Sequence, residues 1–314
     1  MSAQTNGPTD ADTDVTGAPK STAVPVAVPA AAPTPDLSLA WVPAVLAVAP
    51  NGARRTHRDH AAIPLTAEAM GETARACLEA GAALLHLHVR RADGRHLLDA
   101  DAYRQSIAAI RQAVGDELIV QVTTEAVGLY SPQQQEALVR ALAPEAVSLA
   151  VRELVADAAA EARAARFFAW LAEQPTFVQF IVYSAEDLRR FDDLLARGVI
   201  PGARHSLLFV LGRYSQGQRS DPLDLLPFLQ ANERDHCWAV CAFGGKENSC
   251  AAAALAFGGH VRVGFENNLY LPNGQVAPNN AALIQAAADA AAALARPLAT
   301  AAQARQLFAR LKNV

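Results

Sequence analysis

Two histidines one residue apart are the first feature of this sequence that could do chemistry. His86 and His88 lie in the run LLHLHVR, residues 84–90, and Arg90 follows at the same spacing. Side chains alternate across a β-strand, so all three would share one face. Two imidazoles on one face commonly offer two ligands to one divalent metal. Hydrogen-bonded core histidines are the alternative, but the pair together with an arginine favours metal binding. At the rim, Arg90 could meet substrate, hold a carboxylate or face water.

A second polar face lies near the C-terminus, in the run GGHVRVGFENN, residues 258–268. On a strand, Arg262, Gly264 and Glu266 would share one face. Glu266 could then add a carboxylate to the two histidines, and two histidines, one glutamate and an open position form a common catalytic zinc site. Arg262 would lie deeper and bind a substrate carboxylate or hold Glu266. A purely structural Arg262–Glu266 ion pair is the alternative.

Eight short apolar runs alternate with segments of helical composition, and this pattern would position the polar faces. The runs are 45–50, 84–90, 118–124, 146–151, 176–184, 206–212, 237–244 and 260–266. Such an alternation predicts an α/β fold, a (β/α)8 TIM barrel over residues 40–314, with an additional C-terminal helix at 299–311. A doubly wound sheet is the alternative, but APNGARR after the first run lacks its glycine-rich phosphate turn. In a barrel, sites form at the carboxyl ends of the strands.

Several further polar side chains end or follow the predicted strands. Those we consider as substrate-binding residues are Arg54, Thr124, Ser148, Glu153 and Arg213. The hydroxyl groups could equally cap the helices that follow. Arginines near the mouth fit an anionic substrate.

Composition excludes several classes of function. The net charge of −4 gives no indication of a basic surface for nucleic acid. The sequence contains no run of 18 apolar residues, so no membrane span is predicted. We interpret the four cysteines as small buried residues of a protein in a reducing compartment, and we expect a cytoplasmic location. Charged residues make up 18% of the chain, which indicates surface buried in an oligomer or an alanine-biased genome. Residues 1–39, rich in proline and alanine, predict a disordered leader.

Several motifs in order resemble the β-keto acid cleavage enzyme family, whose founding activity is 3-keto-5-aminohexanoate cleavage. They are APNGA, PLT at 64–66, EAGAALLHLHVRRADG, QVTT, GGHVRVGFENN and NNAALI at 279–284, and the match runs from about residue 43 to the C-terminus. The resemblance implies a (β/α)8 barrel, a homotetramer, and one zinc ion held by His86, His88 and Glu266. It also implies a retro-Claisen reaction in which a β-keto acid and acetyl-CoA give acetoacetate and a new acyl-CoA. Arg262 would belong to the catalytic group, and Thr123 resembles a substrate-binding hydroxyl.

The sequence departs from the family pattern at three places. Asn267 stands where the family typically has an aspartate tied to the arginine in proton abstraction, and a neutral amide cannot act as a general base. Arg54 aligns near an acid that meets the substrate's amino group in the founding enzyme, so we expect a tail that is not cationic. SLAVREL replaces the more usual Gly-Ser-x-Asn-Phe. We place Arg262, Asn267 and Thr123 in the catalytic group, with Glu153 or Glu125 as substitutes for the base.

Two other functions stay open at this point. The chain could be another metal-dependent lyase or hydrolase on the same barrel, with Asn267 marking the change of chemistry. It could also be a non-catalytic barrel that keeps the metal.

Overall fold

Eight parallel strands close into a barrel in the computed structural model, which describes residues 41–312. The barrel strands are β1 (Leu46–Val48), β2 (Leu84–Leu87), β5 (Ile119–Thr123), β6 (Ala146–Ala150), β7 (Phe177–Val182), β8 (Ser206–Leu211), β9 (Cys237–Ala242) and β10 (His260–Val263). They follow one another around the barrel in chain order, and β1 pairs with both β2 and β10. This confirms the predicted TIM barrel. The predicted leader, residues 1–39, lies outside the described residues.

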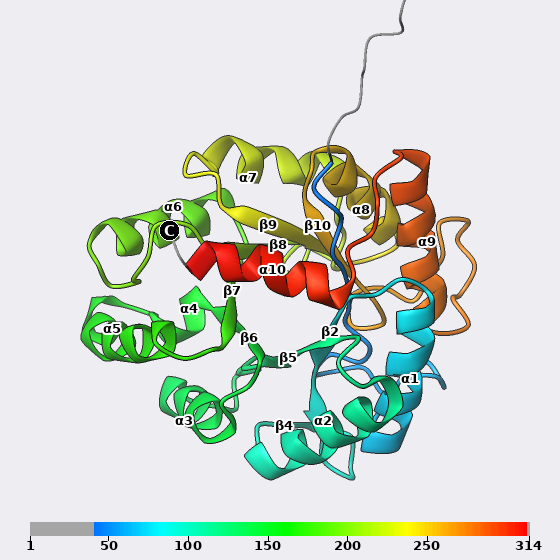
Figure 1. Cartoon of the computed structure of the whole chain (residues 1–314), viewed down its shortest axis with the longest axis horizontal. Helices are drawn as coiled ribbons and strands as arrows, with labels where there is room; N and C mark the ends of the chain where they lie inside the picture. Colours follow the sequence, from blue (N-terminus) through cyan, green and yellow to red (C-terminus); the bar gives the residue numbers. More distant parts are fainter. Residues whose placement is uncertain (1–40, 313–314) are drawn as a thin grey trace, which may run out of the picture. The chain divides into compact units, whose positions relative to one another are not determined.

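Helices surround the strands, as Figure 1 shows. They are α1 (Ala67–Glu79), α2 (Ala100–Val114), α3 (Pro132–Leu142), α4 (Val151–Leu154), α5 (Ala158–Ala172), α6 (Ala185–Ala196), the 3-10 turn η1 (Pro222–Leu225), α7 (Leu226–Ala231), α8 (Glu247–Ala256), α9 (Asn280–Ala293) and α10 (Ala301–Lys312). Polar residues begin many of them: Thr66 accepts from the backbone N–H of Ala69, and Ser131 forms a capping box with Gln134. Within the described part of the chain, no helix has the length and apolar character needed to cross a membrane.

Alternation along the strands separates an apolar outer face from a partly polar interior. On β2, Leu85 and Leu87 belong to the main hydrophobic core between strands and helices, while His86 points into the barrel. A chain of buried polar side chains crosses the interior at this level: Gln121 on β5 donates to Gln179 on β7, and Gln179 donates to Ser206 on β8. The interior is therefore packed with side chains that hold one another in place.

The amino-terminal end of the barrel is closed by α10, the predicted additional helix, which lies across the strands in Figure 1. Phe308 of α10 stacks on Phe177 of β7, with ring centroids 3.7 Å apart. Ala304 and Phe308 are buried against the amino-terminal residues of the strands, among them Val45 and Leu84. The opposite, carboxyl end of the barrel carries the candidate site.

Two strands end three residues earlier than the sequence predicts, the largest differences among the eight. The predicted strand 84–90 stops at Leu87, and Val89–Arg90 forms a separate strand, β3, which pairs antiparallel with β4 (His96–Leu97). The predicted strand 260–266 stops at Val263, because Gly264 adopts φ +142° where its α-carbon passes the backbone of β1. A Cβ at Gly264 would lie 2.4 Å from the carbonyl oxygen of Ala49, so only glycine fits this crossing.

Candidate metal centre

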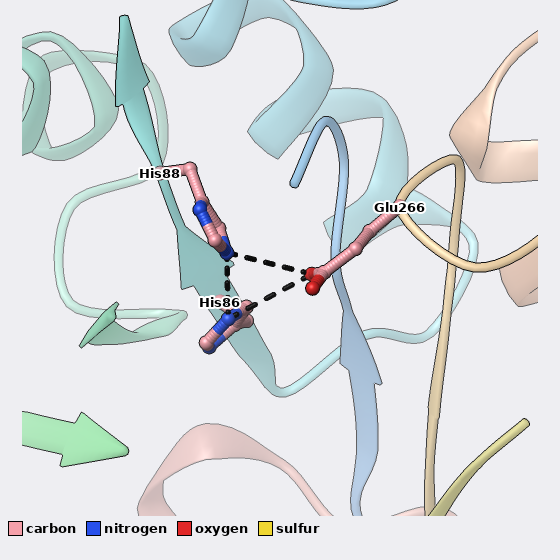
Figure 2. Close-up of side chains that lie close together, drawn as sticks. All are labelled: His86, His88 and Glu266. Atoms are coloured by element: carbon pink, nitrogen blue, oxygen red, sulfur yellow. Dashed lines mark hydrogen bonds and ion pairs between the residues drawn. The ribbon is translucent and has the colours of Figure 1, made fainter. Parts of the chain in front are cut away.

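His86, His88 and Glu266 converge at the carboxyl end of the barrel (Figure 2). His86 lies on β2 and His88 directly after it, while Glu266 lies in the turn after β10. The two Nε2 atoms are 3.1 Å apart, and Glu266 Oε2 lies 3.7 Å and 3.6 Å from them. Since β2 and β10 both flank β1, the closure of the barrel brings these distant residues together. The three side chains form a candidate metal site, as the residue spacing predicts.

The protonation of the histidines suits a metal. His86 Nδ1 lies 2.8 Å from Gln121 Oε1, and the Gln121 amide is oriented by its own hydrogen bond to Gln179. An amide oxygen only accepts, so His86 carries its proton on Nδ1 and presents the Nε2 lone pair to the centre. Burial lowers the pKa of His86 to about 4 and holds that of His88 well below its ordinary value. Both imidazoles are therefore neutral at pH 7, the form that binds metal.

Glu266 completes a donor set that fits a divalent cation. Its Oε2 is buried and has no hydrogen-bond donor among the described residues, although it faces both imidazoles. The backbone fixes its position, because Glu266 N donates to the carbonyl of Ala49 and Gly52 packs against its side chain. Two neutral imidazoles and one carboxylate are the ligand types of many zinc sites.

Arg262 lies beneath Glu266, as the sequence predicts. Its Nη2 is 3.5 Å from Glu266 Oε1 and donates to the sulfur of Cys241 on β9 at 3.2 Å. Burial raises the pKa of the Cys241 thiol to about 12, so the thiol keeps its proton and donates it to Asn267 Oδ1 at 3.2 Å. Arg262, Cys241 and Asn267 are thus linked in one buried chain.

Asn267 is fully buried and turned toward α8. Its amide donates to Glu247 Oε1 at 3.2 Å, and the same carboxylate accepts from Gly264 N and from the Asn268 amide. Three donors from one turn therefore meet Glu247, the first residue of α8. Burial raises the pKa of Glu247 to about 8. Sequence analysis missed this residue, because an acid in the first turn of a helix is ordinary.

A cavity beside the metal ligands is lined by several of the predicted site residues. Its lining comprises His86, Thr123, Glu125, Ile181, Tyr183, Val210, Arg213, Phe243, Arg262 and Glu266. Arg54 joins Glu125, Arg213 and Glu266 in the adjoining cavity. Glu125 Oε1 lies 3.5 Å from Arg54 Nη1 and 3.4 Å from Arg213 Nη2. Arg54 and Arg213, both predicted to bind substrate, therefore contact the same carboxylate.

Three predicted substrate-binding residues are not among those that line this cavity. Thr124 donates its hydroxyl to the carbonyl of Ser148. Ser148 is buried on β6, and its own hydroxyl has no partner among the described residues. Glu153 accepts from the backbone of Ala126 and, at 2.6 Å, from the Gln135 amide.

Arg90 has a structural position rather than any of the three predicted ones. Its guanidinium donates to four backbone carbonyls, those of Asn51, Gly52, Gly94 and Arg55, at 2.6 to 3.1 Å. It therefore holds the loop after β1, the loop that packs against Glu266. The expectation was wrong because it continued the strand past His88, whereas the chain turns there.

Gln121 is the residue beside the metal centre that sequence reasoning missed and could have found. It precedes Thr123 by two positions on β5, so alternation places both on the inner face. His260 lies far from this centre and serves the fold, because its Nδ1 accepts from the N–H of Val45 at the amino-terminal end of the barrel.

Fold and site together define a (β/α)8-barrel protein with a His2Glu candidate metal centre at the carboxyl ends of its strands. The chain belongs to the β-keto acid cleavage enzyme family, whose model matches residues 43–309. It is an enzyme of that family.

Two relatives support this assignment, and a solved structure shares the fold. A 3-keto-5-aminohexanoate cleavage enzyme of Fusobacterium nucleatum is 30% identical over 272 residues, 84% of this chain and 97% of the relative. A 3-oxoadipate:acetyl-CoA acetyltransferase of Cupriavidus necator is 31% identical over 276 residues, 85% of this chain and 94% of the relative. The structure of ObcA in a binary complex with oxaloacetate matches with a TM-score of 0.62 at 17% identity, covering 79% of this chain and 67% of that one. At that identity the likeness concerns the fold alone.

Proposed function

We propose that this chain is a zinc-dependent β-keto acid cleavage enzyme. A β-keto acid, R–CO–CH2–COO⁻, and acetyl-CoA would give acetoacetate and R–CO–SCoA. The CH2–COO⁻ unit moves from the acyl group R–CO to the acetyl group, and the thiolate of CoA takes the acyl group in exchange. Family membership supports the reaction, as do the names of the relatives that use acetyl-CoA.

The observation that carries the proposal is the His86–His88–Glu266 cluster, in which two imidazole nitrogens and one carboxylate oxygen lie within 4.8 Å of one another. Bound there, zinc would act as a Lewis acid that polarises the keto group and stabilises its enolate. Nitrogen and carboxylate ligands in this number favour zinc over calcium or magnesium, which prefer oxygen ligands alone.

Charge at the mouth supports a substrate whose tail is not cationic. Arg54 and Arg213 flank Glu125, so two positive charges face one negative charge there. Arg262 lies deeper and is paired with Glu266, so it does not change this balance at the mouth. An ammonium group would be repelled, whereas a neutral or anionic tail would be accepted. The relative from Cupriavidus necator is named for 3-oxoadipate, a substrate with an anionic tail.

The remaining roles follow from the donor and acceptor atoms that each side chain leaves unused within the protein. Arg262 would hold the carboxylate of the β-keto acid, because only one of its nitrogens is engaged by Cys241 and Glu266. The Thr123 hydroxyl accepts from the backbone of Glu125, which leaves its proton for the substrate. Asn267 would support Arg262 through Cys241. For Thr124, Ser148 and Glu153 a substrate-binding role stays a prediction, as do the homotetramer and the cytoplasmic location.

A panel of β-keto acids with neutral, anionic and cationic tails tests the proposal. The purified protein is loaded with zinc and incubated with each acid and acetyl-CoA, and acetoacetate and the new acyl-CoA are measured together. We expect both products in equal amounts from neutral or anionic acids. His86→Asn should lose the zinc and the activity.

The matched control is His205→Asn, which changes a partly buried histidine just before β8, at the other end of the barrel. It should keep one zinc per chain and full activity. Acetoacetate from no member of the panel would refute the reaction, and full zinc content in both His86→Asn and Glu266→Gln would refute the ligand set.

A further inference from the structure

Two carboxylates line the cavity beside the metal centre, and only one of them is needed as a ligand. Among the described residues, Glu125 and Glu266 are the acidic side chains in this lining. Glu266 faces the imidazoles and Arg262. In the described part of the chain, Glu125 forms its ion pairs with Arg54 and Arg213 and none with His86 or His88, so it lies outside the ligand cluster.

The other nearby acids are already engaged. Glu153, on α4, accepts from a backbone N–H and from Gln135, and it does not line the cavity. Glu247 is buried behind the turn and accepts three hydrogen bonds from it. At the position of the family's acid, Asn267 has an amide that donates to Glu247. None of these groups could take a proton from a molecule in the cavity.

Glu125 is held at its place from several sides. It lies two residues beyond the end of β5, where its backbone N–H donates to the Thr123 hydroxyl and its carbonyl accepts from His96 Nε2 at 2.9 Å. Its side chain is 21% exposed, and Arg54 and Arg213 both contact Oε1. The other oxygen, Oε2, is therefore the one available to a substrate.

The electrostatic setting supports an acid–base role. Burial and, after it, the charge of Glu266 raise the pKa of Glu125 to about 7, while Arg54 opposes the shift. A carboxyl group whose pKa is raised by burial is a stronger base than an exposed one, and this favours a role in proton transfer.

We propose that Glu125 is the general base that removes the C2 proton of the β-keto acid, and that it returns this proton to the product. This assignment rests on the proposed function. The C2–H bond breaks, the proton passes to Oε2 of Glu125, and the electron pair becomes the enolate. The enolate carbon attacks the thioester carbonyl of acetyl-CoA and expels the CoA thiolate.

The same proton completes the cycle. The thiolate attacks the original keto carbon, and the bond from this carbon to C2 breaks. The electron pair stays on C2 as the enolate of acetoacetate, and protonated Glu125 gives its proton to that carbon. One carboxylate therefore serves both half-reactions, with no net gain or loss of protons.

Exchange at C2 tests the base apart from the full reaction. A β-keto acid is incubated with the zinc-loaded enzyme in D2O without acetyl-CoA, and the loss of the C2 proton signal is followed by NMR above the uncatalysed rate. Glu125→Gln keeps the size of the side chain and an oxygen for the two arginines. We expect it to keep one zinc per chain and to exchange C2 at least about 100-fold more slowly than the wild type.

Glu145→Gln is the matched control. Glu145 is also a carboxylate held by two arginines, Arg111 and Arg305, each at 2.6 Å, but it lies at the amino-terminal end of β6. This variant should exchange C2 at the wild-type rate. Glu125→Asp is a second variant in case the amide disturbs folding, and its exchange should be slowed less than that of Glu125→Gln.

The outcomes separate the two proposals. A wild-type enzyme that forms acetoacetate while Glu125→Gln exchanges C2 at the same rate would overturn the assignment alone. Loss of exchange in Glu153→Gln, with exchange kept in Glu125→Gln, would move the base to Glu153. A wild-type enzyme that neither exchanges C2 nor forms acetoacetate would overturn the proposed function and this assignment with it.

Discussion

Replacing Gly52 with alanine should weaken zinc binding without unfolding the barrel. Gly52 adopts φ +58°, and a Cβ there would lie 2.5 Å from Glu266 Cγ, whereas ordinary contact begins at 3.4 Å. The Glu266 side chain would have to move by about an ångström, and metal sites tolerate only about 0.2 Å in ligand distances. We therefore expect zinc affinity to fall by at least about tenfold, or about 1.4 kcal/mol.

The backbone strain of the same substitution has to be measured separately. An alanine at positive φ costs about 1 kcal/mol wherever it occurs. Gly198→Ala provides the control, because Gly198 adopts φ +72° just beyond α6 and a Cβ there meets no atom within 4 Å. Unfolding in urea with a chelator present should show a similar loss of stability in both variants.

Zinc affinity then distinguishes the two variants. Competition with a chromophoric chelator should give a weaker dissociation constant for Gly52→Ala and the wild-type value for Gly198→Ala. Wild-type affinity in a folded Gly52→Ala protein would refute the inference that the loop after β1 holds Glu266 as a ligand.

Three further predictions concern the fold. Burial lowers the pKa of His260 to about 3, so the folded protein keeps this side chain neutral, and its contribution to stability is complete above pH 6.5 and is lost as the pH falls. Between pH 7 and pH 5, the unfolding free energy measured in urea should therefore fall by about 2 kcal/mol more for the wild type than for His260→Gln. An equal fall in both proteins would contradict this prediction. Arg90→Lys should lower the unfolding free energy by about 2 kcal/mol and increase proteolysis of the loop at 51–55, because an ammonium group cannot bridge four carbonyls. A loss below about 0.5 kcal/mol would show that these contacts are dispensable. Phe308→Ala should destabilise by about 3 kcal/mol in the same assay, since it removes the ring stacked on Phe177, and an unchanged midpoint would mean that α10 is not part of the cooperative fold.

Much of the architecture could be predicted because it depends on local patterns. Short apolar runs and helical segments alternate eight times, and that alternation gives the barrel. The metal cluster also follows from simple rules, since alternation places His86 inward and barrel closure puts β10 two strands from β2. His88 reaches the same point although it lies beyond the strand, so this part of the prediction succeeded for a partly wrong reason.

The remaining errors arose where distant segments decide the local structure. The last strand ends at Val263 because β1 passes beside Gly264, and no pattern within the strand announces that crossing. Glu247 accepts from a turn that follows it by 17 to 21 positions, a partnership that only the folded chain reveals. Glu125 was one of two substitutes for the base, and the sequence could not tell which carboxylate faces the cavity.

The position of the metal ligands has a consequence for how the molecule holds together. β1 pairs with β10 where the first and last strands meet, and the ligands come from both flanks of β1. His86 and Glu266 are separated by roughly 180 residues of chain, so the three ligands come together only after most of the barrel has folded and β10 has paired with β1. A cation bound there would favour the closed ring by mass action, by about 4 kcal/mol at a thousand times its dissociation constant. A metal ion at this centre would therefore stabilise the closed barrel, and metal binding would indicate that the first and last strands have paired.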